Sequence, residues 1–413
     1  MSETSGEYDR RNFLINLFEG ALFIAGASFM SAQTVIPALI NRLGGGNVAV
    51  GAIGVINWLG LYLPQLFAAR YSQTKIMKKP WAIRIGFYQR MIIPFMILTI
   101  FLFGELHPLI TIWLFLLFFT SYQMLTGLAT PFWFDMFAKL TPVGKRGRLS
   151  GARSALAGAG GFLGAILLTW LFTIFRFPVN YALAFSLAFA LQIISILFQY
   201  LLVEEFPSKV ISKQTAGEYF RQLRDTVRGN HSYRIFIRTL IPLTLATMPV
   251  GFFTIYGMHF FKTGESIIGQ FTLMMVAGQG IGALLNGFLA DRFGNKVALI
   301  SAASALGCAS LLAVLSPSIE IFRFVFIFVG MNLGSELMIR HNLALEYSPV
   351  EQRSTYIGLM NAAVAPFYLS SLLGGWISDI FGYPVLFIAG GIFSLAGIIL
   401  IIFRVHEPRS GKH

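Results

Sequence analysis

The feature that most constrains this chain is a succession of apolar stretches, each about 20 residues or longer, that fills almost its whole length. A bilayer core about 30 Å thick is crossed by about 20 apolar residues in an α-helix. A soluble domain could not bury so many stretches of this kind, because 56% of the residues are hydrophobic and only 12% are charged. The pattern excludes a soluble enzyme, a disordered chain and a coiled coil. It predicts an all-α integral membrane protein.

Twelve such stretches can be delimited, and they fall into two groups of six. The predicted transmembrane helices are 12–40, 47–70, 81–104, 108–139, 148–175, 179–203, 234–262, 265–290, 296–316, 320–346, 353–380 and 384–405. A polar linker over 204–233 separates an expected N-terminal six-helix bundle, 1–203, from a C-terminal one, 234–413. Inside the linker, Thr215 and Glu218 have the spacing of a capping box and predict a cytoplasmic amphipathic helix. Its role, as a surface helix or as a partner-binding segment, stays open.

The distribution of basic residues predicts the orientation. Of the 31 Lys and Arg residues, the side opposite the termini carries Arg42, Arg176, Lys262 and Arg323. Positively charged loops stay in the cytoplasm, so both termini are expected to be cytoplasmic, in the plasma membrane. The net charge of +13 is then a feature of topology, and no nucleic-acid partner is expected.

The two groups of spans are related in sequence. PVGKRGRLSG at 142–151 and PVEQRSTYIG at 349–358 share Pro, Val, Arg and Gly at equal spacing, and FRFPV at 175–179 matches FGYPV at 381–385. The order and positions of these matches predict an internal six-helix repeat, and therefore two pseudo-symmetric bundles. Halves of this kind place a binding site near the middle of the membrane, between them.

The segment GFLADRFGNK at 287–296 ends the eighth predicted span. It resembles the loop signature GxLADRxGRK of the major facilitator superfamily, with Asn295 in place of the usual basic residue. With the twelve spans and the repeat, the resemblance covers nearly the whole chain. It implies a secondary active transporter that works by alternating access. The first half departs from the family pattern, because Ala69 stands where the signature has Asp.

The loop signature implies a cytoplasmic gate. Its expected residues are Gly287, Asp291, Arg292, Gly294 and Lys296, together with Arg148 at the start of the fifth span. Gly287 would let another helix approach closely, and the Asp291 carboxylate would accept hydrogen bonds at the N-terminus of that helix. A basic loop that serves topology alone is the alternative.

Ionisable residues inside the spans are few and therefore informative. Glu19 lies about 10 Å into the first span and Arg90 about 13 Å into the third, at 1.5 Å per residue. Glu336 and Arg340, four residues apart in the tenth span, share a helix face and can pair. Loss of hydration favours the neutral form of a carboxyl group, so these four residues are the predicted proton-coupling set, with Glu19 ranked first. For the pair in the tenth span, an ion pair that only fixes packing is the alternative.

In the family, the first, fourth, seventh and tenth helices line the cavity, so polar residues there are expected to contact the substrate. The candidates are Gln33, Gln123, Thr126, Tyr256, Asn332 and Ser335. We expect a small solute, protons and the lipid bilayer as partners and a functional monomer. We expect no cofactor and no metal, since the six His are scattered and Cys308 is the single Cys. A flippase-like lipid-handling protein or an intramembrane enzyme on the same scaffold is the other interpretation, although no catalytic constellation is recognisable and an enzyme is not expected.

Overall fold

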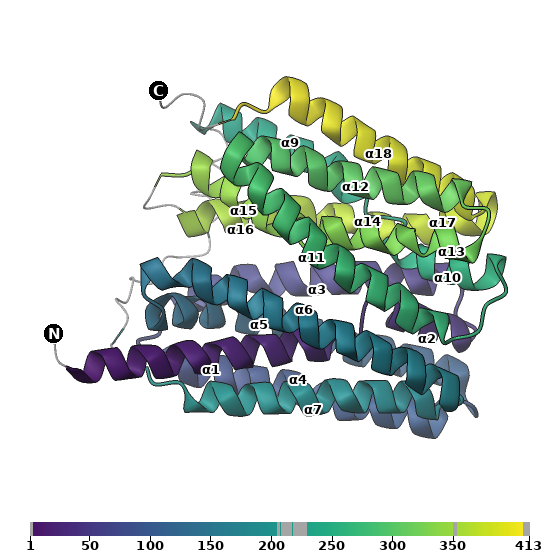
Figure 1. Ribbon diagram of the computed structural model, residues 1–413, viewed down its shortest axis with the longest axis horizontal. Coiled ribbons are helices and arrows are strands. Elements are labelled where there is room, and N and C mark those ends of the chain that lie inside the picture. Colours follow the sequence, from purple (N-terminus) through teal and green to yellow (C-terminus); the bar gives the residue numbers. More distant parts are fainter. Residues whose placement is uncertain (1–2, 205–206, 208–216, 218–228, 350–352, 408–413) are drawn as a thin grey trace. The chain divides into compact units, whose positions relative to one another are not determined.

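The computed structural model describes residues 3–204, 207, 217, 229–349 and 353–407, and it is helical throughout, with no strand in these ranges (Figure 1). The helices of the first half are α1 (Glu3–Ser28), α2 (Val35–Arg42), α3 (Asn47–Ser72), α4 (Lys79–Phe103), α5 (Pro108–Leu140), α6 (Val143–Ile174) and α7 (Val179–Leu201). Those of the second half are α9 (His231–Leu245), α10 (Val250–Phe260), α11 (Ile267–Phe293), α12 (Asn295–Leu315), α13 (Ile319–Phe322), α14 (Phe324–Leu333), α15 (Glu336–Tyr347), α16 (Arg353–Val364), η2 (Ala365–Leu369), α17 (Ser370–Phe381) and α18 (Tyr383–Arg404). The linker helix predicted from Thr215 and Glu218 falls outside the described residues.

Eleven helical segments in the described ranges are long and apolar enough to cross a membrane, and they correspond to the second to twelfth predicted spans. The first predicted span corresponds to α1 and α2. It is more polar than the others, because residues 10–19 hold two Arg, two Asn and one Glu. The prediction of an all-α membrane protein is confirmed.

Four of the predicted spans, the first, seventh, tenth and eleventh, are interrupted. In the first, seventh and tenth spans, the break in the helix involves polar residues or proline. Between α1 and α2, the Ser31 hydroxyl accepts hydrogen bonds from the backbone N–H groups of Gln33 and Thr34, at 3.3 and 3.2 Å. Pro249 directly precedes α10, and Ser335 directly precedes α15. Irregular backbone at membrane depth is tolerated where it is buried in protein or lines a water-filled cavity. The breaks therefore mark the first and tenth spans as places where polar groups face the protein interior.

The chain divides into two compact units. Unit 1 consists of Met1–Gly45, Gly60–Lys213 and Glu265–Leu273, and unit 2 of Gly46–Leu59, Gln214–Gly264 and Met274–His413. Their boundaries fall inside α3 and α11, which places one end of each helix in each unit. The two bundles over 1–203 and 234–413 stay a prediction.

In unit 1, α1 packs against α6 and α7, while α4 packs against α5 and α7 (Figure 1). Two glycines of α6 permit the close approach of α1. A Cβ at Gly160 would lie 3.1 Å from the Ala25 side chain, and one at Gly164 would lie 3.0 Å from the Phe29 ring. An apolar cluster stabilises the same unit and consists of Ile15, Ala68, Ala82, Phe132, Met136, Leu140 and Leu202.

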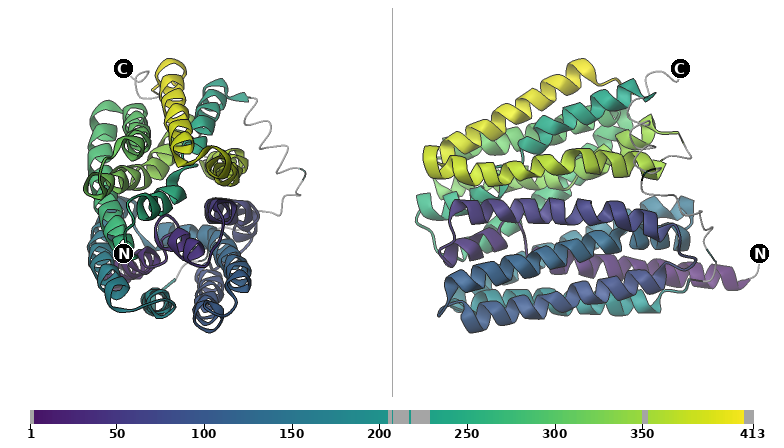
Figure 2. Two further views of the ribbon diagram at one scale, coloured as in Figure 1. Left: turned by 90° about the vertical axis from the view of Figure 1, so that its right-hand side faces the viewer. Right: turned by 180° about the vertical axis from the view of Figure 1, so that it is seen from behind.

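In unit 2, α12 packs against α14 and α18, and α18 also packs against α9. The right-hand view of Figure 2 shows α18 in yellow alongside α9 in teal. Gly397 of α18 lies so close to Leu243 of α9 that an added Cβ would overlap the leucine side chain. Small residues thus bring backbones together in this unit as well.

Candidate functional site

The inner face of α1 is polar although it is buried. Asn12, Asn16 and Glu19 are 5%, 0% and 3% exposed. The Asn12 amide docks this helix on the end of α7: it donates to the Val203 carbonyl and accepts from the Val203 N–H, both at 3.0 Å. Asn16 and Glu19, three residues apart, share one helix face further along.

Glu19 forms an ion pair with Arg153 of α6. The carboxylate oxygen Oε2 lies 3.0 Å from the guanidinium Nη2, and the two side chains are 4% and 11% exposed. The guanidinium carbon of Arg153 lies 4.4 Å from the centre of the Trp133 ring and 5.9 Å from that of Phe137, both on α5. Three helices therefore supply one buried charged site: α1 the anion, α6 the cation and α5 an aromatic wall.

Gly20 makes room for this ion pair. A Cβ on Gly20 would overlap the guanidinium of Arg153, which lies directly over the α1 backbone at that point. Any larger residue at position 20 would have to displace the arginine. The absence of a side chain next to Glu19 is thus what lets the cation cross from α6 to α1.

Two polar groups beside the ion pair have no partner within the described part of the chain. Both side-chain polar atoms of Asn16 are buried without a hydrogen bond, and so is Nε of Arg153. Asn16 is four residues before Gly20, so its side chain lies one helical turn from the place where Arg153 crosses α1. Buried polar groups are normally hydrogen-bonded, and an unpaired one requires an explanation. A bound polar solute or water would satisfy these groups.

Arg90 forms several hydrogen bonds in the same unit. Its Nε donates to the Gln192 carbonyl at 2.7 Å, Nη1 donates to the Gly86 carbonyl at 2.9 Å, and Nη2 donates to the Ser195 hydroxyl at 3.3 Å. Its guanidinium carbon lies 5.1 Å from the centre of the Phe23 ring. These contacts fix Arg90 between α4 and α7. Arg153 is the ion-pair partner of Glu19 in this structure, and the role of Arg90 in proton coupling stays a prediction.

Two substrate candidates of α5 lie near this network. The Thr126 hydroxyl accepts from the Gln89 amide at 2.7 Å and donates to the Tyr122 carbonyl at 2.8 Å. Gln123 is 9% exposed, and Gly60 of α3 packs against it. Thr126 is therefore engaged in helix packing, while its role in substrate binding stays a prediction. The remaining candidate of unit 1, Gln33, sits at the break between α1 and α2.

In unit 2, Glu336 and Arg340 form the predicted ion pair at the beginning of α15. Arg340 is 2% exposed. The neighbouring candidates bind other helices: the Asn332 amide donates to the Ala302 carbonyl at 3.0 Å, and the Ser335 hydroxyl accepts from Asn286 at 2.8 Å. These groups hold α11, α12, α14 and α15 together.

Tyr256, the substrate candidate of α10, belongs to an aromatic cluster in unit 2. Its ring centre lies 5.0 Å from that of Phe260, 5.7 Å from that of Tyr383 and 5.1 Å from that of Phe387. Aromatic pairs at these separations are typical of packing. Its contact with a substrate stays a prediction.

The expected gate residues separate into two groups. Asp291 is exposed and has no hydrogen bond or ion pair to any described residue, and a Cβ at Gly287 would meet nothing within 4 Å. The cytoplasmic gate expected at Gly287 and Asp291 stays a prediction. Arg292 lies over its own neighbours, 5.9 Å from the Phe288 ring centre and 5.3 Å from that of Phe293. Arg148 is exposed.

The remaining residues of the signature hold the start of α12. Gly294 has a φ of 92°, and the Glu407 carboxylate occupies the space a Cβ would need. The Lys296 N–H donates to Glu407 at 2.8 Å, and the Asn295 amide donates to Glu346 at 2.8 Å. Asn295, the departure from the family pattern, thus makes a specific contact with the end of α15.

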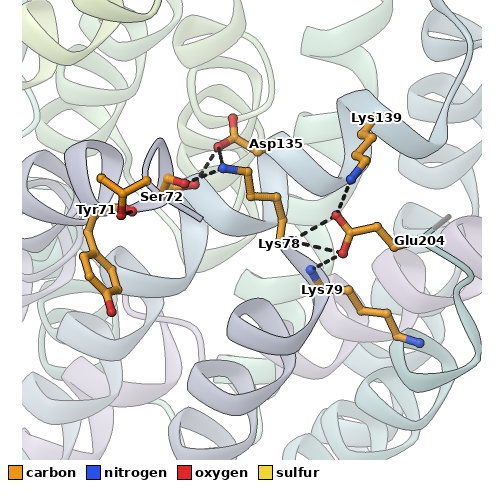
Figure 3. Close-up of polar contacts among 8 residues, drawn as sticks. Tyr71, Ser72, Lys78, Lys79, Asp135, Lys139 and Glu204 are labelled. Atoms are coloured by element: carbon orange, nitrogen blue, oxygen red, sulfur yellow. Dashed lines mark hydrogen bonds and ion pairs between the residues drawn. The ribbon is translucent and has the colours of Figure 1, made fainter. Parts of the chain in front are cut away.

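A charged cluster holds the equivalent end of unit 1 (Figure 3). The Glu204 carboxylate, which follows α7, accepts from the backbone N–H groups of Lys78 and Lys79 at 2.8–3.0 Å and from the Lys139 ammonium at 2.8 Å. The Lys78 ammonium donates to the Ser72 carbonyl and lies 3.8 Å from Asp135. Burial lowers the pKa of Lys78, while the nearby carboxylates of Asp135 and Glu204 oppose that shift.

Sequence reasoning missed Arg153, Asn16 and Glu204. The predicted fifth span begins at 148, which places Arg153 at the membrane surface. The helix begins at Val143, so Arg153 lies ten residues inside it. An arginine within a glycine-rich helix was the signal available in the sequence. Nothing in the sequence indicates that Asn16 lacks a partner, because that depends on three other helices.

Known proteins resemble this chain in part of its sequence and in its fold. The sequence profile of the Major Facilitator Superfamily matches residues 235–413. The nucleoside transporter NupG superposes with a TM-score of 0.71 at 10% identity, covering 96% of this chain and 98% of that one. A POT family transporter in complex with a thioalcohol-conjugated peptide gives 0.73 at 13% identity, over 95% and 96%. The second half of the chain, residues 235–413, thus matches the Major Facilitator Superfamily, and the solved structures share the fold along nearly the whole chain.

Several curated relatives are transporters by name. The 4-hydroxybenzoate transporter PcaK of Pseudomonas aeruginosa is 29% identical over 34% of this chain and 32% of its own length. The cis,cis-muconate transport protein of Acinetobacter baylyi is 33% identical over 34% of each chain. The niacin transporter NiaP of the same organism is 29% identical over 32% of this chain and 30% of its own. The chain thus matches about a third of the length of each, and the prediction that it is not an enzyme agrees with these names.

Proposed function

We propose that this protein is a secondary active transporter that carries a small organic acid, together with protons, by alternating access. The relatives support the substrate class, because 4-hydroxybenzoate, cis,cis-muconate and niacin are all carboxylic acids. The predicted location is the cytoplasmic membrane, with both termini in the cytoplasm.

The observation that carries this proposal is the buried Glu19–Arg153 ion pair with the unpartnered Asn16 beside it. A buried guanidinium requires an anion, and its planar donors match a carboxylate. Glu19 is the internal anion in this conformation. A substrate carboxylate has the same chemistry and competes for the same cation.

Proton coupling follows from this competition. When Glu19 is protonated it no longer neutralises Arg153, and the guanidinium is free to bind a substrate carboxylate. When the substrate leaves, loss of the proton restores the Glu19 carboxylate to Arg153. Proton and organic anion therefore bind together and leave together, which keeps the charge of the buried site constant.

The aromatic and amide groups give the site its shape. Trp133 and Phe137 flank the guanidinium, so a planar ring attached to the carboxylate can stack against this wall. The Asn16 amide offers both a donor and an acceptor to a hydroxyl or ring nitrogen of the solute. Glu336 and Arg340 form a second candidate coupling pair in unit 2.

The test compares acids with their neutral amides. Purified full-length protein is heated with niacin or nicotinamide, and with 4-hydroxybenzoate or its amide, and the melting temperature is measured. A carboxylate that binds Arg153 raises the melting temperature by mass action, whereas the matching amide does not. Arg153→Gln is expected to remove this stabilisation, and Arg176→Gln, which changes an exposed arginine, is expected to retain it.

Uptake into proteoliposomes then tests transport. A labelled acid that stabilises the protein is expected to accumulate when the exterior is more acidic than the lumen. Equal stabilisation by an acid and its amide would contradict the carboxylate class, and accumulation that ignores the pH gradient would contradict proton coupling.

A further inference from the structure

An open groove of about 440 Å³ lies on the outer surface of unit 1, away from the Glu19–Arg153 pair. It is lined by Lys79, Pro80, Ile83, Arg84, Phe87, Tyr88 and Tyr200. Six of these residues follow the helical repeat of α4, and Tyr200 comes from the end of α7. The groove therefore runs between two neighbouring transmembrane helices.

The groove faces outward. Phe87, Tyr88 and Tyr200 are 41%, 58% and 52% exposed, and Arg84 is exposed as well. Tyr200 lies at the end of α7, and exposed aromatic side chains near the end of a transmembrane helix are typical of the interface between lipid headgroups and acyl chains. Arg84 is five residues beyond Lys79, the first residue of α4, which is about 8 Å along the helix. We expect an exposed guanidinium at this position to lie at the level of the lipid headgroups.

The groove contains two cationic side chains, Arg84 and Lys79, that have hydrogen-bond donors available for a ligand. Arg84 has no hydrogen bond or ion pair to any residue in the described ranges; its guanidinium lies 5.8 Å from the Trp81 ring centre. The Lys79 ammonium donates to the carbonyls of Tyr200 and Leu202, at 2.8 and 2.5 Å, and an ammonium has a third donor. No carboxylate lines the groove.

We propose that this groove binds the headgroup of an anionic phospholipid. Arg84 and the third donor of Lys79 hold the phosphate, and Tyr200 flanks the glycerol region. Phe87 and Tyr88, further along α4, contact the beginning of the acyl chains. A basic pocket between transmembrane helices is suited to this ligand, because the phosphate neutralises a cation that is otherwise costly at this depth. The predicted orientation places the lipid in the cytoplasmic leaflet.

The experiment measures lipid binding to the delipidated full-length protein in detergent by native mass spectrometry. Phosphatidylglycerol is expected to bind more tightly than phosphatidylcholine of the same chain length. Arg84→Gln is expected to weaken phosphatidylglycerol binding about fivefold, the effect of one basic side chain near an anionic surface. Arg84→Lys, which keeps the charge, is expected to retain most of the binding.

Arg176→Gln serves as the matched control. Arg176 is also an exposed arginine, but it lies in the loop before the start of α7, whereas Tyr200 of the groove lies at the other end of that helix. It is expected to bind phosphatidylglycerol like the wild type. Equal binding of the two lipids, or wild-type affinity in Arg84→Gln, would overturn the proposal. So would displacement of the lipid by glycerol phosphate at equal concentration, which would indicate a site for a soluble phosphate.

Discussion

Lys79 and Lys296 make the same pair of contacts, one in each half of the chain. The backbone N–H of each donates at 2.8 Å to the carboxylate that follows the last helix of its half, Glu204 or Glu407. The ammonium of each donates to a backbone carbonyl near the end of that helix, at 2.8 and 2.9 Å. The start of α4 is thus bound to the end of α7 in the same way as the start of α12 is bound to the end of α18. This correspondence supports the internal repeat predicted from the sequence.

Glu204→Gln is expected to destabilise the protein by about 1–3 kcal/mol, because the partly buried Lys139 loses its anion and two N–H groups at the start of α4 lose a charged acceptor. Thermal unfolding in detergent measures the change. Glu105→Gln, which alters an exposed carboxylate in the loop after α4, is expected to match the wild type. Equal melting temperatures for Glu204→Gln and the wild type would show that this contact is not stabilising.

Lys78 predicts a pH dependence. Burial lowers its pKa in the folded protein below the ordinary value of 10.5. Between the lowered and the ordinary pKa, the unfolded chain binds more protons than the folded one, so stability rises with pH in that alkaline window. Lys78→Gln is expected to flatten this rise when melting temperatures are compared from pH 8 to 10.5. The same slope in the wild type and the variant would rule out Lys78 as its source.

Periodicity and composition predict the fold well, because apolar length is a local property of each span. They predict the Glu336–Arg340 pair for the same reason, since both residues lie on one helix. The partner of Glu19 could not be predicted in this way. It depends on where α6 begins, on the missing side chain of Gly20 and on how α1 packs against α6. Contacts between distant helices are fixed by packing, which leaves little trace in a single sequence.

Variants at Asp291 and Asn295 distinguish a gate residue from a residue that makes a structural contact. Asp291 is exposed without a described partner, so Asp291→Asn is expected to leave the melting temperature unchanged. Asn295→Ala is expected to cost about 1 kcal/mol, through loss of the bond to Glu346. If Asp291 closes a cytoplasmic gate in another conformation, spin-label distances across that face lengthen in Asp291→Asn. An unchanged distance distribution would eliminate Asp291 as a gate residue.

Gly20→Ala tests the crossing of Arg153 over α1. Replacing a helical glycine by alanine normally stabilises a helix by about 1 kcal/mol. Here the new methyl group overlaps the guanidinium, so the variant is expected to unfold at a lower temperature and to bind acids more weakly. Gly158→Ala in α6 is the matched control, because its Cβ meets nothing within 4 Å, and it is expected to be as stable as the wild type or more so. A stabilised Gly20→Ala protein would mean that Arg153 does not occupy this position.

Glu19→Gln tests the coupling step itself. The amide keeps the shape of the side chain but cannot release a proton, so Arg153 stays without an internal anion at every pH. The variant is expected to bind organic acids at least as well as the wild type, because the competing carboxylate is gone. It is also expected to exchange labelled acid for unlabelled acid across the membrane, since exchange requires only that the transporter changes conformation with substrate bound.

Accumulation driven by a pH gradient should be lost in Glu19→Gln, because no proton moves with the substrate. Proteoliposome uptake with and without the gradient, beside counterflow exchange, separates these outcomes. Accumulation at the wild-type level in Glu19→Gln would assign coupling to another group, and Glu336→Gln would then be the next variant to measure.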